Sequence, residues 1–133
     1  MAKDALLLIG RLLVAILFLV SGWRTLGDIA GSQAYFDGLG LPVPVLFAWG
    51  VGLFELFGGA LLALGFWLRG AALSLAAFSV AAAFVGQYGQ GGADAALRFM
   101  HMQMFWKDLA IAGGLLALSA AGAGAYSLDA RRR

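Results

Sequence analysis

The chain has 133 residues, of which 62% are hydrophobic and 12% are charged. A soluble domain of this length cannot bury so much apolar surface, so the composition predicts an integral membrane protein and excludes the ordinary soluble classes. The net charge of +2 is not spread over a basic face, which excludes nucleic-acid binding, and the absence of cysteine excludes disulfides and thiol chemistry.

Four segments are apolar and long enough to cross a bilayer as helices, which takes about 20 residues each. We expect these spans at residues 5–23, 45–68, 71–88 and 104–122. The first span carries Arg11 and has no A-x-A-like cleavage site, so we expect it to be retained and not removed as a signal peptide. The whole chain, residues 1–133, is expected to be one all-α domain, an integral membrane four-helix bundle.

The connections between the spans differ in length. Only Arg69 and Gly70 separate the second and third spans, so these two helices are expected to be antiparallel neighbours. The first outer loop, residues 24–44, contains the helix-breaking sequence LGLPVP. The second outer loop contains the polar, glycine-rich sequence QYGQGGADAALRF, which is compatible with a short helix at its end.

The distribution of basic residues predicts the orientation. An even number of spans places both termini on one side of the membrane. With the termini inside, Lys3, Arg69 and the C-terminal Arg131, Arg132 and Arg133 are cytoplasmic, whereas only Arg24 and Arg98 lie outside. The positive-inside rule therefore predicts that both termini are cytoplasmic, with the terminal arginines beside acidic lipid head groups.

Four ionisable residues lie within or just inside the spans, namely Arg11, Glu55, Lys107 and Asp108. Their charges sum to zero, and an unpaired charge at the bilayer centre costs at least about 2.5 kcal/mol. At 1.5 Å per residue, Arg11 lies about 10 Å from the inner edge of the membrane and Glu55 about 14 Å. We therefore expect Glu55 to pair with Arg11, and Lys107 on the outer side to reach the same carboxylate.

Two interpretations of these charges remain open. In the first, they form a buried ion pair that fixes how the helices pack and has no chemistry. In the second, they line a polar pocket that binds a head group or relays a proton. A quinone carbonyl that accepts a hydrogen bond from Arg11 or Lys107, with Glu55 nearby, suits the second interpretation.

The sequence FMHMQMFW, residues 99–106, places Met100 and Met104 on one helix face with His101 beside it. Thioether and imidazole groups suit copper(I), but methionines also fill gaps at the start of a helix. Because the chain has one histidine and no cysteine, we expect no metal site here. The glycine-rich sequences do not match a nucleotide-binding motif.

The order of these features resembles the DoxX family of small four-span bacterial membrane proteins. RLLVAILFLVSGWRTL is similar to the family's opening R-L-L…F-x-x-S-G-x-x-K-L pattern, and GLFELFGGALLALGFWLRGAA is similar to its E-x-x-G-G-x-x-L-x-x-G…R-x-A-A stretch. FWKDLAIAGGLLAL and GAGAYSLD resemble its closing span and tail, with Asp108 where the family commonly has asparagine. The matching positions are Arg11, Ser21, Gly22, Glu55, Gly58, Gly59, Gly65 and Arg69.

The resemblance implies a protein of the bacterial inner membrane that serves as a membrane subunit or accessory of a redox complex. Relatives include membrane subunits of thiosulfate:quinone oxidoreductases, so quinone and a soluble oxidoreductase or sulfurtransferase are the implied ligand and partner. The alternatives are a small transporter, which would need a homodimer, and a purely structural membrane anchor. With no cysteine and one histidine, we do not expect a stand-alone enzyme, and the family implies no catalytic residue set.

Overall fold

The computed structural model describes residues 1–132. Within these residues the chain is helical and has no strand. Four helices are long and apolar enough to cross a membrane, over Ala2–Gly27, Pro44–Leu64, Leu68–Gln87 and Ala95–Ala121. The helices are α1 (Ala2–Gly27), α2 (Ile29–Gly38), α3 (Pro44–Leu64), α4 (Leu68–Ala82), η1 (Ala83–Gln87), α5 (Ala95–Ala121) and α6 (Leu128–Arg131).

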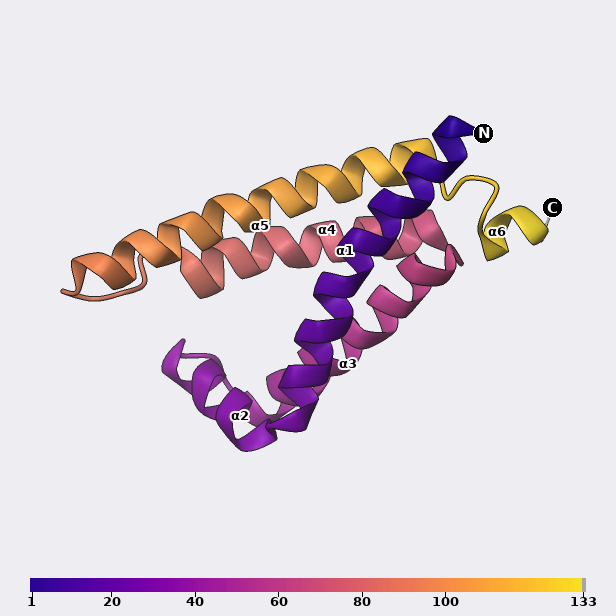
Figure 1. Ribbon diagram of the computed structural model, residues 1–133. Helices are drawn as coiled ribbons and strands as arrows, with labels where there is room; N and C mark the ends of the chain where they lie inside the picture. Colours follow the sequence, from indigo (N-terminus) through magenta and orange to yellow (C-terminus); the bar gives the residue numbers. More distant parts are fainter. Residues whose placement is uncertain (133) are drawn as a thin grey trace.

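The long helices form two antiparallel pairs, α1 with α3 and α4 with α5 (Figure 1). The pairs meet at the end of the molecule that carries both termini and diverge toward the opposite end, where α2 lies (Figure 1). Although α3 and α4 are consecutive, the main packing partner of α3 is α1. The chain is therefore a four-helix membrane bundle that is closed at one end and open at the other.

Backbone atoms come very close together between α1 and α3. A Cβ atom on Gly22 would lie 2.7 Å from the backbone nitrogen of Leu56 and 2.8 Å from the carbonyl oxygen of Gly52. On the facing helix, a Cβ on Gly59 would lie 3.1 Å from the backbone nitrogen of Leu19. Glycine on both sides thus lets the two helices pack through their backbones, which is a common way to hold membrane helices together.

The reversal between α3 and α4 lies at Gly65–Trp67, a few residues before the expected Arg69–Gly70 turn. Gly65 ends α3 in the left-handed conformation, with φ +66°, and its N–H bonds to carbonyls of the last helical turn. Trp67, with φ +51°, precedes α4 in the same region, which a tryptophan rarely adopts. Three hydrogen bonds join this turn to Asp129 of the C-terminal segment: its carboxylate accepts two, and its N–H donates one to the Gly65 carbonyl.

Two further helical features lie outside the expected spans. The first outer loop contains α2, which begins where the Asp28 side chain accepts a hydrogen bond from the Gly31 N–H. The fourth span begins at Ala95 and not at residue 104, because the Asp94 side chain caps the N–H groups of Ala96 and Leu97. At 27 residues α5 is about 40 Å long, so it extends past the hydrocarbon layer.

The apolar core fills the closed end, where the two pairs meet. Its largest aliphatic side chains are fully buried, and they come from α3, α4 and α5: Leu62, Leu68, Leu75 and Leu115. Ala15 and Phe18 of α1 complete it. The lipid-facing surface carries many exposed large apolar side chains, as expected for a chain that is surrounded by hydrocarbon.

Candidate functional site

Arg11 lies in the closed end, away from the other three charged residues of the spans. Its side chain is 1% exposed, and its guanidinium donates hydrogen bonds to the carbonyl oxygens of Ala123 at 2.6 Å and Tyr126 at 2.7 Å. A third, longer bond of 3.4 Å reaches Ala63 near the end of α3. The expected Arg11–Glu55 pair is thus not formed, because backbone carbonyls of the C-terminal segment take the place of the carboxylate.

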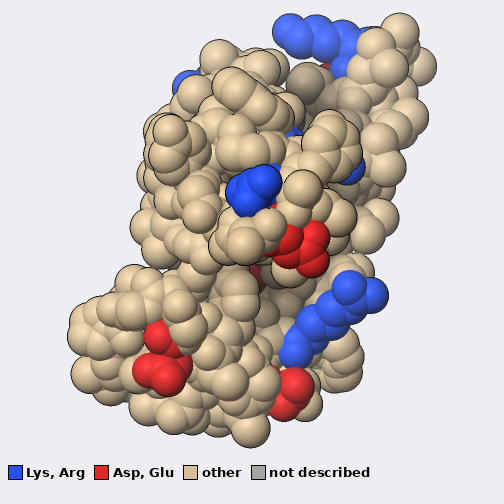
Figure 2. Space-filling model, turned by 90° about the vertical axis from the view of Figure 1, so that its left-hand side faces the viewer, with Lys and Arg blue, Asp and Glu red and all other residues tan. Residues whose placement is uncertain are grey.

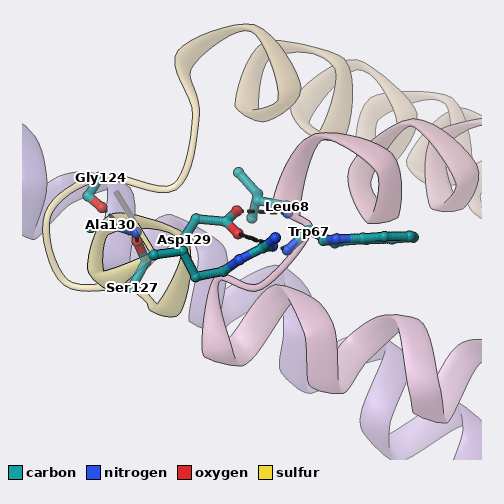
Figure 3. A network of polar contacts seen from close by, with 7 residues as sticks. Trp67, Leu68, Gly124, Ser127, Asp129 and Ala130 are labelled. Atoms are coloured by element: carbon teal, nitrogen blue, oxygen red, sulfur yellow. Dashed lines mark hydrogen bonds and ion pairs between the residues drawn. The ribbon is translucent and has the colours of Figure 1, made fainter.

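The C-terminal segment is also held from the other side. The Asp129 carboxylate accepts hydrogen bonds from the N–H groups of Trp67 at 2.9 Å and Leu68 at 3.0 Å, which supports the strained turn before α4 (Figure 3). Ser127 accepts a bond from the Ala130 N–H and donates one to the Gly124 carbonyl (Figure 3). Arg11 and Asp129 therefore fasten this segment to the α3–α4 turn, and their role is structural.

Glu55 lies in α3 near the middle of the membrane and is 6% exposed. The Ser21 hydroxyl of α1 is close enough to interact with its carboxyl group. No ion pair within 4 Å involves Glu55 among residues 1–132. A carboxyl group that is buried here beside a hydroxyl, and without a cation, suits proton exchange or ligand binding better than it suits an ion pair.

Glu55 faces a cavity of about 860 Å³ between the two helix pairs, on the open side of the core. We call it the interhelical cavity. Its walls are largely apolar, with side chains from α1 to α5 and η1. Its polar lining residues include Ser21, Tyr35, Glu55, Ser79, Lys107 and Asp108, of which Glu55 and Ser79 are buried.

Lys107 and Asp108 of α5 line the interhelical cavity together with Glu55 of α3. The structure therefore brings together three of the four predicted site residues and leaves Arg11 out. Lys107 forms no ion pair within 4 Å in the part of the chain described, so its ammonium group is available to a ligand. Seen from the open end, acidic and basic side chains lie near one another on an otherwise uncharged face (Figure 2).

Several polar residues of this cavity were not predicted from the sequence, among them Ser21, Tyr35 and Ser79. Ser21 and Ser79 lie within apolar spans, where a lone serine gives no signal except that Ser21 belongs to the S-G motif. Tyr35 lies in residues 24–44, which the sequence predicts to be a loop. It projects from α2, and a Cβ on Gly86 would lie 3.0 Å from its hydroxyl oxygen. Burial, and then the nearby Asp108 carboxylate, raise the pKa of Tyr35, so its hydroxyl remains a hydrogen-bond donor at neutral pH.

The third span ends in a π-helical turn, η1, that forms part of the cavity wall. Such turns are rare, and they occur often at functional sites. Gln87 of η1 is bound to α5 through a 2.7 Å hydrogen bond between its Oε1 and Nδ1 of His101. His101 thus has a structural partner, and residues 1–132 contain no group of three His, Asp or Glu side chains placed to hold a metal ion.

Two curated proteins are similar to the chain over nearly its full length. Inner membrane protein YqjF of Escherichia coli K12 is 34% identical over 132 residues, which cover 96% of this chain and 92% of that protein. Inner membrane protein YphA of the same strain is 34% identical over 131 residues, with 98% and 92% coverage. No solved structure matches the chain.

The family comparison agrees with the motifs. The DoxX family model matches residues 6–87, which include α1, α3, α4 and η1 and therefore Ser21, Glu55 and Ser79 of the interhelical cavity. The match covers more than half of the chain, and the relatives are named as inner membrane proteins. The chain is an integral inner-membrane protein that belongs to the DoxX family.

Proposed function

We propose that the protein is the membrane subunit of a quinone-linked redox complex and that the interhelical cavity holds the quinone head group. The observation that carries the proposal is the cavity itself, in which apolar walls surround a few convergent polar groups within a membrane-spanning bundle. That combination is typical of sites for amphipathic small molecules. An apolar tail would extend into the surrounding lipid.

The polar groups suit the chemistry of a quinone. Reduction of a quinone to the quinol takes up two electrons and two protons. Lys107 and the Tyr35 hydroxyl are donors that can bind the carbonyl oxygens, whereas Glu55 and Asp108 are carboxyl groups that can exchange protons with them. The chain has no cysteine and one histidine, so the electrons are supplied by a soluble oxidoreductase partner.

The packing of the bundle argues against the transporter alternative. The cavity is lined by residues on the open side of Leu62, Leu75 and Leu115, all of which have no exposed surface. These side chains, with their neighbours in the core, close the path from the cavity to the end that carries the termini. A pathway across the membrane would require this core to separate.

The test uses photoaffinity labelling of the protein in lipid nanodiscs with an azido-quinone, followed by mass-spectrometric mapping. We expect the label on peptides that line the interhelical cavity and loss of labelling when an excess of unmodified short-chain quinone is added. Ala82→Trp places a large ring in the cavity wall and should abolish labelling, whereas Ala110→Trp, on the exposed face of α5, should not.

A second pair of variants tests the role of the carboxyl group. Glu55→Gln keeps the shape of the side chain but cannot take up a proton, so quinone still binds while quinone reduction by the native partner complex falls. Asp37→Asn removes a carboxylate from the exposed surface of α2 and should leave quinone binding and quinone reduction unchanged. Labelling that is not reduced by Ala82→Trp, or that maps to lipid-facing residues, would rule out the quinone site.

A further inference from the structure

A second cavity, of about 1010 Å³, lies at the closed end of the molecule. We call it the terminal cavity. It is bounded by the first turn of α1, the α3–α4 turn, the start of α4, the α5–α6 loop and α6. It is therefore separated from the interhelical cavity by the apolar core, and the proposed function makes no use of it.

Basic side chains from three separate parts of the chain line the terminal cavity: Lys3 of α1, Arg69 of α4 and Arg132 after α6. Arg69 lies across it, since its Nη2 atom would be 3.8 Å from a Cβ on Gly122 of the α5–α6 loop. Neither Lys3 nor Arg69 has an acidic partner within 4 Å among the residues described. Two unpaired cations thus face the same hollow.

The two acidic residues of the cavity wall are already engaged by groups of the protein. Asp4 accepts a hydrogen bond from the Ala125 N–H at 3.0 Å and lies 3.7 Å from the N-terminal ammonium group. Asp129 accepts bonds from two N–H groups of the α3–α4 turn and lies 3.9 Å from Arg132. The charge left over in the cavity is therefore positive, at Lys3 and Arg69.

The position of the cavity identifies the anion that it fits. The cavity lies where α1 and α4 begin and α5 ends, which is the level of lipid head groups for helices of these lengths. Trp67, which is 64% exposed, also lines the cavity, as tryptophans do at the membrane interface, and the partly buried Leu7 adds an apolar wall. Guanidinium and ammonium groups are the usual partners of phosphate.

We propose that the terminal cavity binds the phosphate group of an anionic phospholipid, with Lys3 and Arg69 as its ligands. The lipid belongs to the leaflet that faces the two termini, and its upper acyl chains lie against Leu7. Basic pockets at the ends of membrane helices bind lipid head groups in this way.

The test is native mass spectrometry of the purified protein in mild detergent, titrated with phosphatidylglycerol or with phosphatidylcholine of the same chain length. We expect the protein to retain phosphatidylglycerol in preference. Lys3→Gln and Arg69→Gln should each weaken its binding about five-fold, which is the contribution expected of one basic residue at an anionic lipid. Arg69→Lys, which keeps the charge, should restore most of the affinity.

Arg131→Gln is the matched control, because it removes a charge from the same end of the molecule but from outside the cavity lining. It should change phosphatidylglycerol binding by less than about two-fold. If Arg131→Gln and Arg69→Gln weakened phosphatidylglycerol binding equally, the lipid would be held by general surface attraction, and the proposed site would be overturned.

Inorganic phosphate distinguishes a lipid from a free anion. We expect millimolar phosphate to leave bound phosphatidylglycerol in place. Displacement by phosphate alone, or equal retention of the two lipids by the unaltered protein, would overturn the proposal. Quinone is absent from these measurements, so their outcome is independent of the proposed function.

Discussion

Arg11 shows how a buried cation can be held without a carboxylate: its two Nη atoms donate to backbone carbonyls, while Nε has no hydrogen-bond partner among residues 1–132. Its two shortest hydrogen bonds go to carbonyl oxygens of the segment that follows α5, and a carbonyl at the end of a helix is an effective acceptor for a cation. The guanidinium thereby joins three parts of the chain that meet at the closed end: α1, the end of α3 and the C-terminal segment.

We predict that Arg11→Gln lowers the free energy of unfolding by at least about 2 kcal/mol, because buried carbonyls of Ala123 and Tyr126 lose their donor. Unfolding in mixed micelles measures the loss, and hydrogen exchange should show faster exchange over residues 122–131. Arg24→Gln is the control: its side chain is exposed, and the change should stay within about 0.5 kcal/mol. Equal stability of the two variants would contradict this account.

The sequence predicted that charged residues within the spans are buried, and this is correct for Arg11 and Glu55. It did not predict which groups surround them. Depth and charge balance favoured an Arg11–Glu55 pair, but depth along a helix says nothing about the direction in which a side chain points. The acceptors of Arg11 are backbone atoms about 112 residues further along the chain, and a backbone carbonyl has no signature in a sequence.

At the level of the helices, the small residues had the clearest meaning. Gly22, Gly52 and Gly59 lie where α1 and α3 touch, so the absence of a side chain at these positions lets the two helices approach closely. By contrast, α2 was missed, and the helix at the end of the second outer loop was expected to be short and separate, whereas it is the start of α5. Both are marked by an aspartate N-cap, Asp28 and Asp94, in stretches whose glycines suggested loops.

Gly22→Ala should separate α1 from α3, since the added methyl group would overlap backbone atoms that cannot move on their own. We expect a loss of stability of about 1 to 3 kcal/mol. Gly10→Ala, in the same helix with no atom within 4 Å of the added carbon, should be neutral or slightly stabilising. Unfolding of the two variants in mixed micelles makes the comparison, and a similar loss in both would disprove the close contact.

At the level of the whole molecule, the two helix pairs enclose an apolar core at one end and a cavity with a few polar groups at the other. The core of leucines and alanines occupies the end with the termini, and the interhelical cavity with Glu55, Lys107 and Asp108 occupies the other. Four spans and an even count follow from hydropathy alone. Hydropathy does not predict that α1 pairs with α3 and α4 with α5, because each helix is apolar on several faces.

The distribution of basic residues predicts an orientation for the bundle, and this prediction can be tested directly because the chain has no native cysteine. We predict that both termini are cytoplasmic, as the positive-inside rule requires. A membrane-impermeant maleimide should label Ala93→Cys in intact spheroplasts and Ala125→Cys only after lysis. Ala93 precedes α5 and Ala125 follows it, so the two sites must label from opposite sides. The reverse labelling pattern would show that both termini lie on the outer side of the membrane.

The fastening of the C-terminal segment has a consequence for biosynthesis. Arg11 leaves the ribosome well before Ala123 and Tyr126, its two closest acceptors, which follow it in the chain by 112 and 115 residues. During most of translation the nascent first helix therefore carries a cation that has no lasting partner. Closure of the bundle is a late step, and a chain released before residue 123 would present an unshielded arginine to the membrane's quality-control proteases.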